Sequence, residues 1–113
     1  MIAKKYRLSE RELKKVFREK KPFFSSMMVA NVRKNNFSHA RVGILLSGKN
    51  TPGSVNRNAF RRLFYKSAWK ILESEYDVVV VLKKGTKLSH KNPQDLENFQ
   101  QNLDFIFQKI LSQ

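Results

Sequence analysis

Asp77-Val78-Val79-Val80-Val81-Leu82 is the stretch that decides the fold of this chain. A continuous β-branched run of this kind is typical of a central strand that is covered on both faces of its sheet. The chain has 113 residues, of which 41% are hydrophobic, so it has the length of one domain and enough apolar side chains for a core. We therefore expect a single domain, residues 1–113, built around this strand.

Two further strands are predicted before the central one. Residues Phe23 to Val32 alternate with a period of two, and Ala40 to Ser47 form a second apolar segment. The polar turn Arg33–Asn36 lies between them, which predicts an antiparallel pair joined by a hairpin-like loop. A short extra strand near Pro22 to Ser25 is an open alternative.

Three amphipathic helices complete the predicted fold. The first begins at a capping box that starts at Ser9, and it ends near Lys20 or Lys21. The second spans about residues 55–73, and the third follows the start signal Asn92-Pro93. The order α-β-β-α-β-α indicates an α+β domain in which helices pack on a small central sheet.

The net charge of +14 is confined to the first two thirds of the sequence. Residues 1–70 carry 18 Lys and Arg against 3 acidic residues, a balance of +15, whereas residues 71–113 carry 5 against 6, a balance of −1. Such a field attracts polyanions and steers their encounter, which indicates a nucleic acid as partner. An anionic membrane is the rival partner, but it needs an exposed apolar helix face, and the predicted helices need theirs for the core.

Cysteine usage and hydropathy indicate the compartment. The chain has no cysteine, which excludes disulfides and thiolate metal sites and fits a reducing environment. No run approaches 18 apolar residues, and no apolar segment follows the basic N-terminus, so neither a transmembrane helix nor a secretory signal is expected. We therefore expect a cytoplasmic protein with no membrane partner.

The start of the second predicted helix carries the clearest binding signal. Arg57, Asn58, Arg61 and Arg62 lie near a helix end where backbone N–H groups are unpaired. Cations at this end oppose the helix dipole, and a phosphate ligand would reverse that penalty. Guanidinium forks and an amide suit phosphate-rich RNA, so we expect RNA contact here, with Tyr65 on the same outer face.

The opposite stripe of that helix is predicted to anchor it to the sheet. Residues at helical spacing share one face there and are mostly apolar. They are Phe60, Leu63, Phe64, Ser67 and Ile71. Ala59 is expected near this buried side.

A second candidate surface combines aromatic rings with a lysine. Phe17 ends the apolar stripe of the first predicted helix, and Lys49 lies just beyond the strand that ends at Ser47. Rings beside cations hold single-stranded nucleic acid because bases stack on them. The alternative is that Phe17 packs in the core, as aromatic residues on a helix stripe usually do.

No constellation of residues indicates catalysis by the protein itself. Glu73, Glu75 and Asp77 cluster at the entry to the central strand, where caps and solvated turns are expected. His39 and His90 lie in predicted loops without an acidic partner, which is typical of ordinary surface histidines. No spacing of His and carboxylates suits a metal, so we expect no catalytic residue, no metal ligand and no small-molecule substrate.

Several motifs taken together resemble the protein subunit of bacterial ribonuclease P. That family has a strand with Arg-Val-Gly-x-x-x-Ser-x-Lys, a glycine loop, and a helix that opens with Val-x-Arg-Asn-Arg-x-(Lys/Arg)-Arg. The chain has Arg41-Val42-Gly43-Ile44-Leu45-Leu46-Ser47-Gly48-Lys49, then Gly53, then Val55-Asn56-Arg57-Asn58-Ala59-Phe60-Arg61-Arg62. The family's first helix, which ends in Val-Phe, appears as Val16-Phe17, so the similarity covers nearly the whole chain in the right order.

The resemblance implies a ribosomal-protein-like sandwich with a mixed sheet and a left-handed crossover at the second helix. It also implies that the catalyst is an RNA subunit, which uses Mg²⁺ to hydrolyse one phosphodiester of precursor tRNA and free the tRNA 5′ end. Four residues match by position the motif that binds the RNA subunit: Arg57, Asn58, Arg61 and Arg62. Phe17 and Lys49 match the cleft that holds the 5′ leader of precursor tRNA.

Two departures from the family pattern bear on leader binding. Ala59 stands where the family has an arginine, and the first strand reads Ala30-Asn31-Val32 where the family usually has an aromatic residue facing the leader. We therefore expect weaker leader discrimination than in a typical member, seen as a smaller loss of affinity on leader deletion. Two other functions stay open: a general RNA-binding or ribosome-associated protein of similar fold, and a self-sufficient nuclease.

Overall fold

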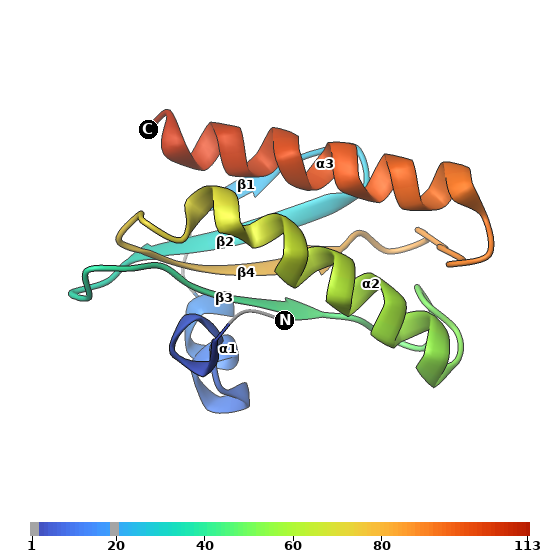
Figure 1. Cartoon of the computed structure of the whole chain (residues 1–113), viewed down its shortest axis with the longest axis horizontal. Helices are drawn as coiled ribbons and strands as arrows, with labels where there is room; N and C mark the ends of the chain where they lie inside the picture. The colour runs from blue at the N-terminus through green and yellow to red at the C-terminus, as the bar shows by residue number, and fades with distance from the viewer. Residues whose placement is uncertain (1–2, 19–20) are drawn as a thin grey trace.

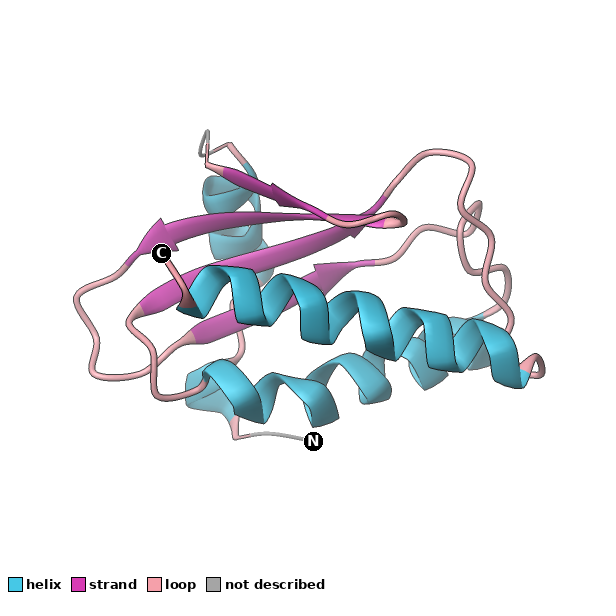
Figure 2. Cartoon of the chain, turned by 90° about the horizontal axis from the view of Figure 1, so that it is seen from above, coloured by secondary structure: helices cyan, strands magenta, loops and turns pink. Residues whose placement is uncertain are grey.

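The computed structural model describes residues 3–18 and 21–113, which form a four-stranded sheet between helices (Figure 1). Helix α1 covers one face of the sheet, and helices α2 and α3 lie side by side on the other (Figure 2). In chain order the elements are η1 (Lys4–Tyr6), α1 (Glu10–Phe17), β1 (Pro22–Phe24), β2 (Met28–Lys34), β3 (Arg41–Leu45), α2 (Ser54–Ser67), η2 (Ala68–Ile71), β4 (Tyr76–Leu82) and α3 (Pro93–Leu111). The predicted α+β sandwich is confirmed.

The strands lie in the order β1-β2-β4-β3, so β4 is central, as its apolar run predicts. It pairs antiparallel with β2 and parallel with β3. The predicted pairing of β2 with β3 is therefore wrong, although these two strands do run in opposite directions. The reason is that β4 is almost wholly buried, so its backbone N–H and C=O groups cannot bond to water and both of its edges must pair with a neighbouring strand.

The first predicted strand is two strands. A tight turn separates β1 from β2: the backbone N–H of Ser25 donates to the Met28 carbonyl oxygen at 2.9 Å, and the Met28 N–H donates to Ser25 Oγ at 3.2 Å. β1 then folds back antiparallel on β2. The alternative of a short extra strand near residues 22–25 is confirmed.

The crossover connection from β3 through α2 to β4 is left-handed, which is rare. In Figure 1 both strands run to the right, α2 returns on the viewer's side, and β4 lies above β3, which makes the crossover left-handed. About 98% of such parallel connections are right-handed. The crossover places α2 and α3 on the same face, where they contact each other.

The helix ends differ in part from the predicted ones. Ser9 and Glu12 form the predicted capping box, and Asn92 caps α3 as predicted. α1 ends at Phe17, earlier than predicted, and Lys20 lies outside the described residues. α2 ends at Ser67 and continues as the tighter turn η2, so the predicted helix to residue 73 is too long.

The core between the sheet and the pair of α2 and α3 is rich in phenylalanine. Phe60 and Phe99 are fully buried and meet edge to face with ring centroids 5.0 Å apart. Each buried side chain of this size contributes about 1.5–3 kcal/mol. Phe64 and Ile71 are also buried, and the buried Ser67 hydroxyl donates to the Leu63 carbonyl oxygen at 2.8 Å. The predicted inner stripe of α2 is confirmed.

Candidate nucleic-acid interface

Helix α2 begins without a side-chain cap and without an acidic residue in its first turn. Gly53 precedes it with φ at 88°, a left-handed conformation that favours glycine. The first intrahelical bond runs from the Arg57 N–H to the Gly53 carbonyl oxygen at 3.0 Å. The first turn of α2 therefore supplies no carboxylate of its own to offset the positive end of this helix.

The polar residues of this end point into solvent or against the preceding loop. Arg57 Nη1 lies 3.5 Å from the Thr51 carbonyl oxygen, and Arg61 Nη1 donates to Asn58 Oδ1 at 2.8 Å. Asn58 and Arg62 are exposed. The ion pairs within residues 3–18 and 21–113 are formed by Arg33, Arg41 and Lys70. None of the arginines of α2 is therefore paired with a carboxylate among these residues. The structure therefore brings Arg57, Asn58, Arg61 and Arg62 together as predicted.

The prediction that Tyr65 lies on this outer face is wrong. Its side chain is 9% exposed and packs edge to face on Phe64 at 5.1 Å between ring centroids. Burial raises the pKa of Tyr65, although the positive charges of Arg7 and Arg61 lower it in part. The reason is that Tyr65 belongs to the hydrophobic core that α2 forms with the sheet and α3. The exposed basic face of α2 is correspondingly narrower than predicted.

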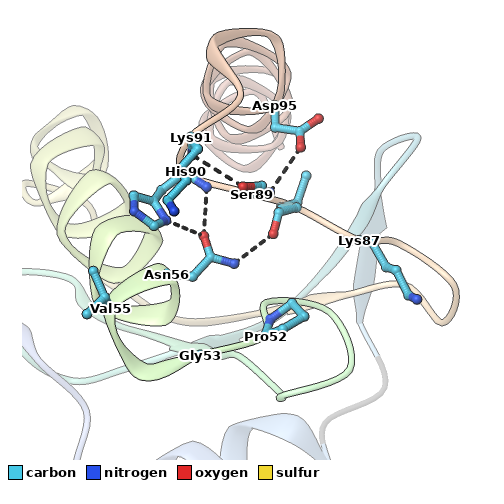
Figure 3. Close-up of a pocket in the computed structure, with 10 residues that line it drawn as sticks. Pro52, Gly53, Val55, Asn56, Lys87, Ser89, His90, Lys91 and Asp95 are labelled. Carbon is cyan, nitrogen blue, oxygen red and sulfur yellow. Dashed lines mark hydrogen bonds between the residues drawn. The ribbon is translucent and has the colours of Figure 1, made fainter.

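Asn56 is a structural residue of this region that the sequence reasoning missed. Its Nδ2 donates to the Leu88 carbonyl oxygen at 2.8 Å, and its Oδ1 accepts from the His90 backbone N–H at 2.7 Å (Figure 3). His90 Nδ1 also lies 3.0 Å from the same oxygen. These bonds fasten the loop after β4 to the first turn of α2. His90 is therefore not an ordinary surface histidine.

The signal for Asn56 was its position one turn before Phe60, on the buried stripe. An amide that faces a core must find hydrogen-bond partners, and here they come from the loop after β4. A cavity of about 520 Å³ lies beside this contact, lined by Val55, Lys87 and Lys91 among others. Figure 3 shows these residues around the start of α2.

The face of the sheet that α1 covers is ordered in rows of cross-strand partners. The row farthest from the start of β4 is apolar and crosses all four strands: Phe24, Val29, Val81 and Leu45. Phe24 is 52% exposed and Leu45 38%, so α1 leaves this row partly open. Lys83 Nζ lies 5.8 Å from the Phe24 ring centroid. The row is a second feature that the sequence reasoning missed, because it depends on the register.

Phe17 and Lys49 both lie at the surface. Phe17 is 48% exposed at the end of α1, which excludes the alternative that it is a core residue. Lys49 is exposed in the loop after β3. The apolar row ends at Leu45, four residues before Lys49 in the sequence.

The middle row lies under α1. It contains Asn31, Val79 and Gly43, and Leu13 of α1 packs so closely on Gly43 that a Cβ there would overlap it. Val16 is buried against Val79 in the same small core. Asn31 is only 9% exposed, so the residue that departs from the family pattern lies beside the open row and not within it.

The third row is charged. Asp77 is fully buried between its cross-strand partners Arg33 and Arg41. Its carboxylate accepts from Arg33 Nη2 at 2.9 Å, from Arg41 Nε at 2.9 Å and Nη2 at 2.7 Å, and from Asn35 Nδ2 at 2.9 Å. Arg41 also pairs with Glu12 of α1. The prediction of a cap or solvated turn at Asp77 is therefore wrong.

The protonation of Asp77 follows from these partners. Burial alone would raise the pKa of this carboxyl group, but hydrogen bonds from Arg41, Arg33 and Asn35 outweigh it, so the pKa lies below its usual range. The lowered pKa favours the ionised carboxylate, which accepts four hydrogen bonds from three side chains. Through Arg41 and Glu12 it fixes the start of α1 on the sheet.

Two properties of the described residues bear on the class of function. Within residues 3–18 and 21–113, no group of three or more His, Cys, Asp or Glu side chains is placed to hold a metal ion. In the same part of the chain, no helix has the length and apolar character needed to cross a bilayer.

The family comparison identifies the chain. A family model described as Ribonuclease P matches residues 2–110. The chain belongs to the ribonuclease P protein family. It is thus a protein subunit of a ribonucleoprotein endoribonuclease that processes tRNA, whose catalytic groups are expected in the RNA. No curated protein matches the sequence.

Solved structures confirm the fold of this ribonuclease P family member. The Staphylococcus aureus RNase P protein superimposes with a TM-score of 0.74 at 19% identity, over 93% of this chain and 94% of that chain. The RNase P protein from Thermotoga maritima superimposes with a TM-score of 0.62 at 23% identity, over 94% of this chain and 92% of that chain.

Proposed function

We propose that the start of α2 binds the RNA subunit of ribonuclease P. The observation that carries this proposal is the cluster of Arg57, Asn58, Arg61 and Arg62 at a helix end without a side-chain cap, where none of the arginines forms an ion pair with another described residue. Bound phosphates would satisfy the guanidinium groups and release the counterions that the RNA otherwise holds. Asn56 supports the cluster by holding the loop after β4 against the same turn.

We further propose that the open apolar row and Phe17 hold the single-stranded 5′ leader of precursor tRNA. Bases stack on exposed rings and lie against aliphatic side chains, while lysines contact the phosphates. Phe17 and Phe24 supply exposed rings. Lys83 supplies a cation beside Phe24, and Lys49 supplies an exposed cation in the loop after β3. The leader thereby gains affinity for the holoenzyme without any chemistry by the protein.

We assign hydrolysis to the RNA subunit and binding of RNA to the protein. Mg²⁺ held by the RNA subunit would supply the activated water for hydrolysis. The protein's part is to bind and orient two RNA strands, since Asp77, the buried carboxylate among the described residues, is bound by arginines and an asparagine. We assign this assembly to the cytoplasm, with precursor tRNA as substrate and no membrane partner.

The proposed function is tested by reconstitution. We expect the purified chain to stimulate 5′ cleavage of precursor tRNA when it is mixed with the host's RNA subunit at low Mg²⁺, because phosphate binding by arginines replaces part of the screening by Mg²⁺. Failure to stimulate would contradict the proposal. Cleavage without any RNA subunit would favour a self-sufficient nuclease, and RNA binding without stimulation would favour a general RNA-binding protein.

Phe17→Ala is expected to lower affinity for precursor tRNA about fivefold or more, since base stacking on an aromatic ring contributes about 1–3 kcal/mol. Affinity for leaderless tRNA should not change. The measurement is holoenzyme binding to the two substrates by fluorescence titration. Phe105→Ala is the matched control, because Phe105 is 49% exposed on α3, on the other face of the sheet. Equal effects of the two variants would contradict the role of Phe17.

A further inference from the structure

A cavity of about 430 Å³ lies at the charged-row end of the α1 face, away from the apolar row. It lies between η1, the start of α1 and the loop from β2 to β3. The residues that matter for the argument are Lys4, Lys5, Arg7, Phe37, His39 and Arg41. From Val81 to Asp77 along β4 the two rows are about 13 Å apart, at 3.3 Å per residue. The cavity is thus separate from the proposed leader surface.

Aromatic rings form one wall of this cavity. Phe37 is 46% exposed and stacks on His39, with ring centroids 5.7 Å apart and an interplanar angle of 29°. Tyr6 meets the His39 ring edge to face at 5.1 Å. The Arg41 Cζ lies 4.5 Å from the Phe37 ring centroid. The wall therefore joins η1 to the loop 35–40 and presents a phenylalanine to solvent.

Hydrogen bonds hold the loop that carries the exposed Phe37 ring. The buried Asn35 donates from Nδ2 to Asp77 at 2.9 Å and to the His39 carbonyl oxygen at 3.3 Å, and its Oδ1 accepts from the Phe37 backbone N–H at 3.0 Å. The loop is thus fixed to the buried carboxylate of the charged row. Because the ring is already ordered, a ligand that stacks on it need not overcome the entropy of ordering the loop.

Cations without carboxylate partners surround the rings. The ion pairs of the described residues involve neither Lys4, Lys5 nor Arg7. Arg7 Nε is also the buried side-chain atom of residues 3–18 and 21–113 that has no hydrogen-bond partner. The charge of Arg41 is balanced by Asp77 and Glu12, so Arg41 is not counted among the free cations. Its guanidinium group packs on the Phe37 ring. Three uncompensated cations remain beside an ordered ring.

We propose that this cavity is a second RNA site, which binds a single-stranded nucleotide with its base on Phe37 and its phosphates at Lys4, Lys5 and Arg7. Stacking rings next to cations are the combination that holds single strands without sequence preference. The site rests on the chain being an RNA-binding protein, but it uses neither the α2 cluster nor the apolar row. An anionic membrane fits less well, because one ring among polar neighbours gives little apolar area to insert.

Photocrosslinking locates the site directly. A short oligouridine that carries 4-thiouridine is irradiated with the full chain, which is then digested with trypsin and examined by mass spectrometry. Because cleavage follows Lys34 and Arg41, the loop is released as the peptide 35–41. We expect a crosslink on this peptide and none on the peptide 92–109, which contains Phe105. Absence of the crosslink on 35–41 would overturn the proposal.

Affinity measurements separate stacking from charge. Phe37→Ala and Phe37→Leu should each weaken oligouridine binding about fivefold or more, whereas Phe37→Tyr and the control Phe105→Ala should not. The double variant Lys4→Ala, Lys5→Ala should reduce the slope of log K against log salt by about 1.4, that is about 0.7 per phosphate contact. Phe37→Leu keeps an apolar side chain at this position, and thermal unfolding checks that each variant is folded.

Each outcome either supports or overturns the proposed site at Phe37. If Phe37→Ala behaves like Phe105→Ala, or if the lysine variant leaves the salt slope unchanged, no nucleotide binds here, and a protein or lipid partner would have to explain the cavity. A chain that fails to stimulate cleavage but crosslinks at 35–41 would remove the proposed function and keep this site. A chain that stimulates cleavage without this crosslink would do the reverse.

Discussion

Replacing both Arg57 and Arg61 with glutamate is expected to lower affinity for ribonuclease P RNA at least about a hundredfold, since two phosphate contacts become two repulsions. The salt slope should also fall by roughly 1.4–1.8. Neither arginine pairs with a carboxylate in the described part of the chain. Stimulation of 5′ cleavage should disappear at RNA concentrations that saturate the unaltered protein. Filter binding over a range of salt concentrations is the measurement.

The fold should survive this change. Both side chains are only partly buried, and a carboxylate near the start of α2 interacts favourably with the helix dipole, by a few tenths of a kcal/mol. The control is the triple variant Gln101→Glu, Gln108→Glu, Lys109→Glu, which changes the net charge by the same −4 on exposed positions of α3. If the α2 variant unfolds, or if both variants lose affinity equally, the α2 cluster is not the contact.

Asp77→Asn is expected to destabilise the protein by about 3–5 kcal/mol, the usual effect of removing one partner of a buried ion pair. The substitution leaves Arg33 without its carboxylate and brings a donor toward Asn35. Urea unfolding followed by circular dichroism gives the free energy. Asp104→Asn is the control, because the pair of Asp104 with Lys70 is exposed and should contribute less than about 1 kcal/mol.

The same variant should change the pH dependence of stability. The pKa of Asp77 lies below its usual range, so its contribution is complete above the ordinary value of about 4 and is lost as the pH falls through the folded-state pKa. Unfolding free energies between about pH 6 and about pH 3 should therefore fall more steeply for the unaltered protein than for Asp77→Asn. A parallel fall in both proteins would mean that Asp77 is not an ionised anchor.

Loss of Asp77 should also disturb the geometry of the proposed RNA surfaces. Arg41 links Asp77 to Glu12 of α1, and Asn35 links it to the loop of Phe37. The network therefore connects stability to binding geometry. In this respect Asp77 is a positioning residue, since all its hydrogen bonds are to protein groups that hold other elements in place.

Local patterns predicted the central strand and the three helices, and they point to the α2 cluster as a binding site. The β-branched run of residues 77–82 predicted the central strand, the capping box at Ser9 predicted the start of α1, and helical periodicity separated Phe60 from Arg61. These features depend on neighbours within a few residues, which is the range that periodicity and capping describe. The charge distribution of the sequence correctly indicated a nucleic-acid partner class for this ribonuclease P family member.

Long-range pairing decided the rest. Three features depend on segments distant in the sequence: the insertion of β4 between β2 and β3, the burial of Tyr65 in the core, and the position of Asp77 between two arginines. A shift of one residue in register would turn every side chain of a strand to the other face. The apolar row that ends at Leu45 and the charged row beneath Phe37 exist for this reason. The sequence by itself determined which segments are helices and strands and where positive charge gathers, and only the tertiary structure decided which side chains share a surface, because register and layer packing bring together residues that local patterns cannot relate.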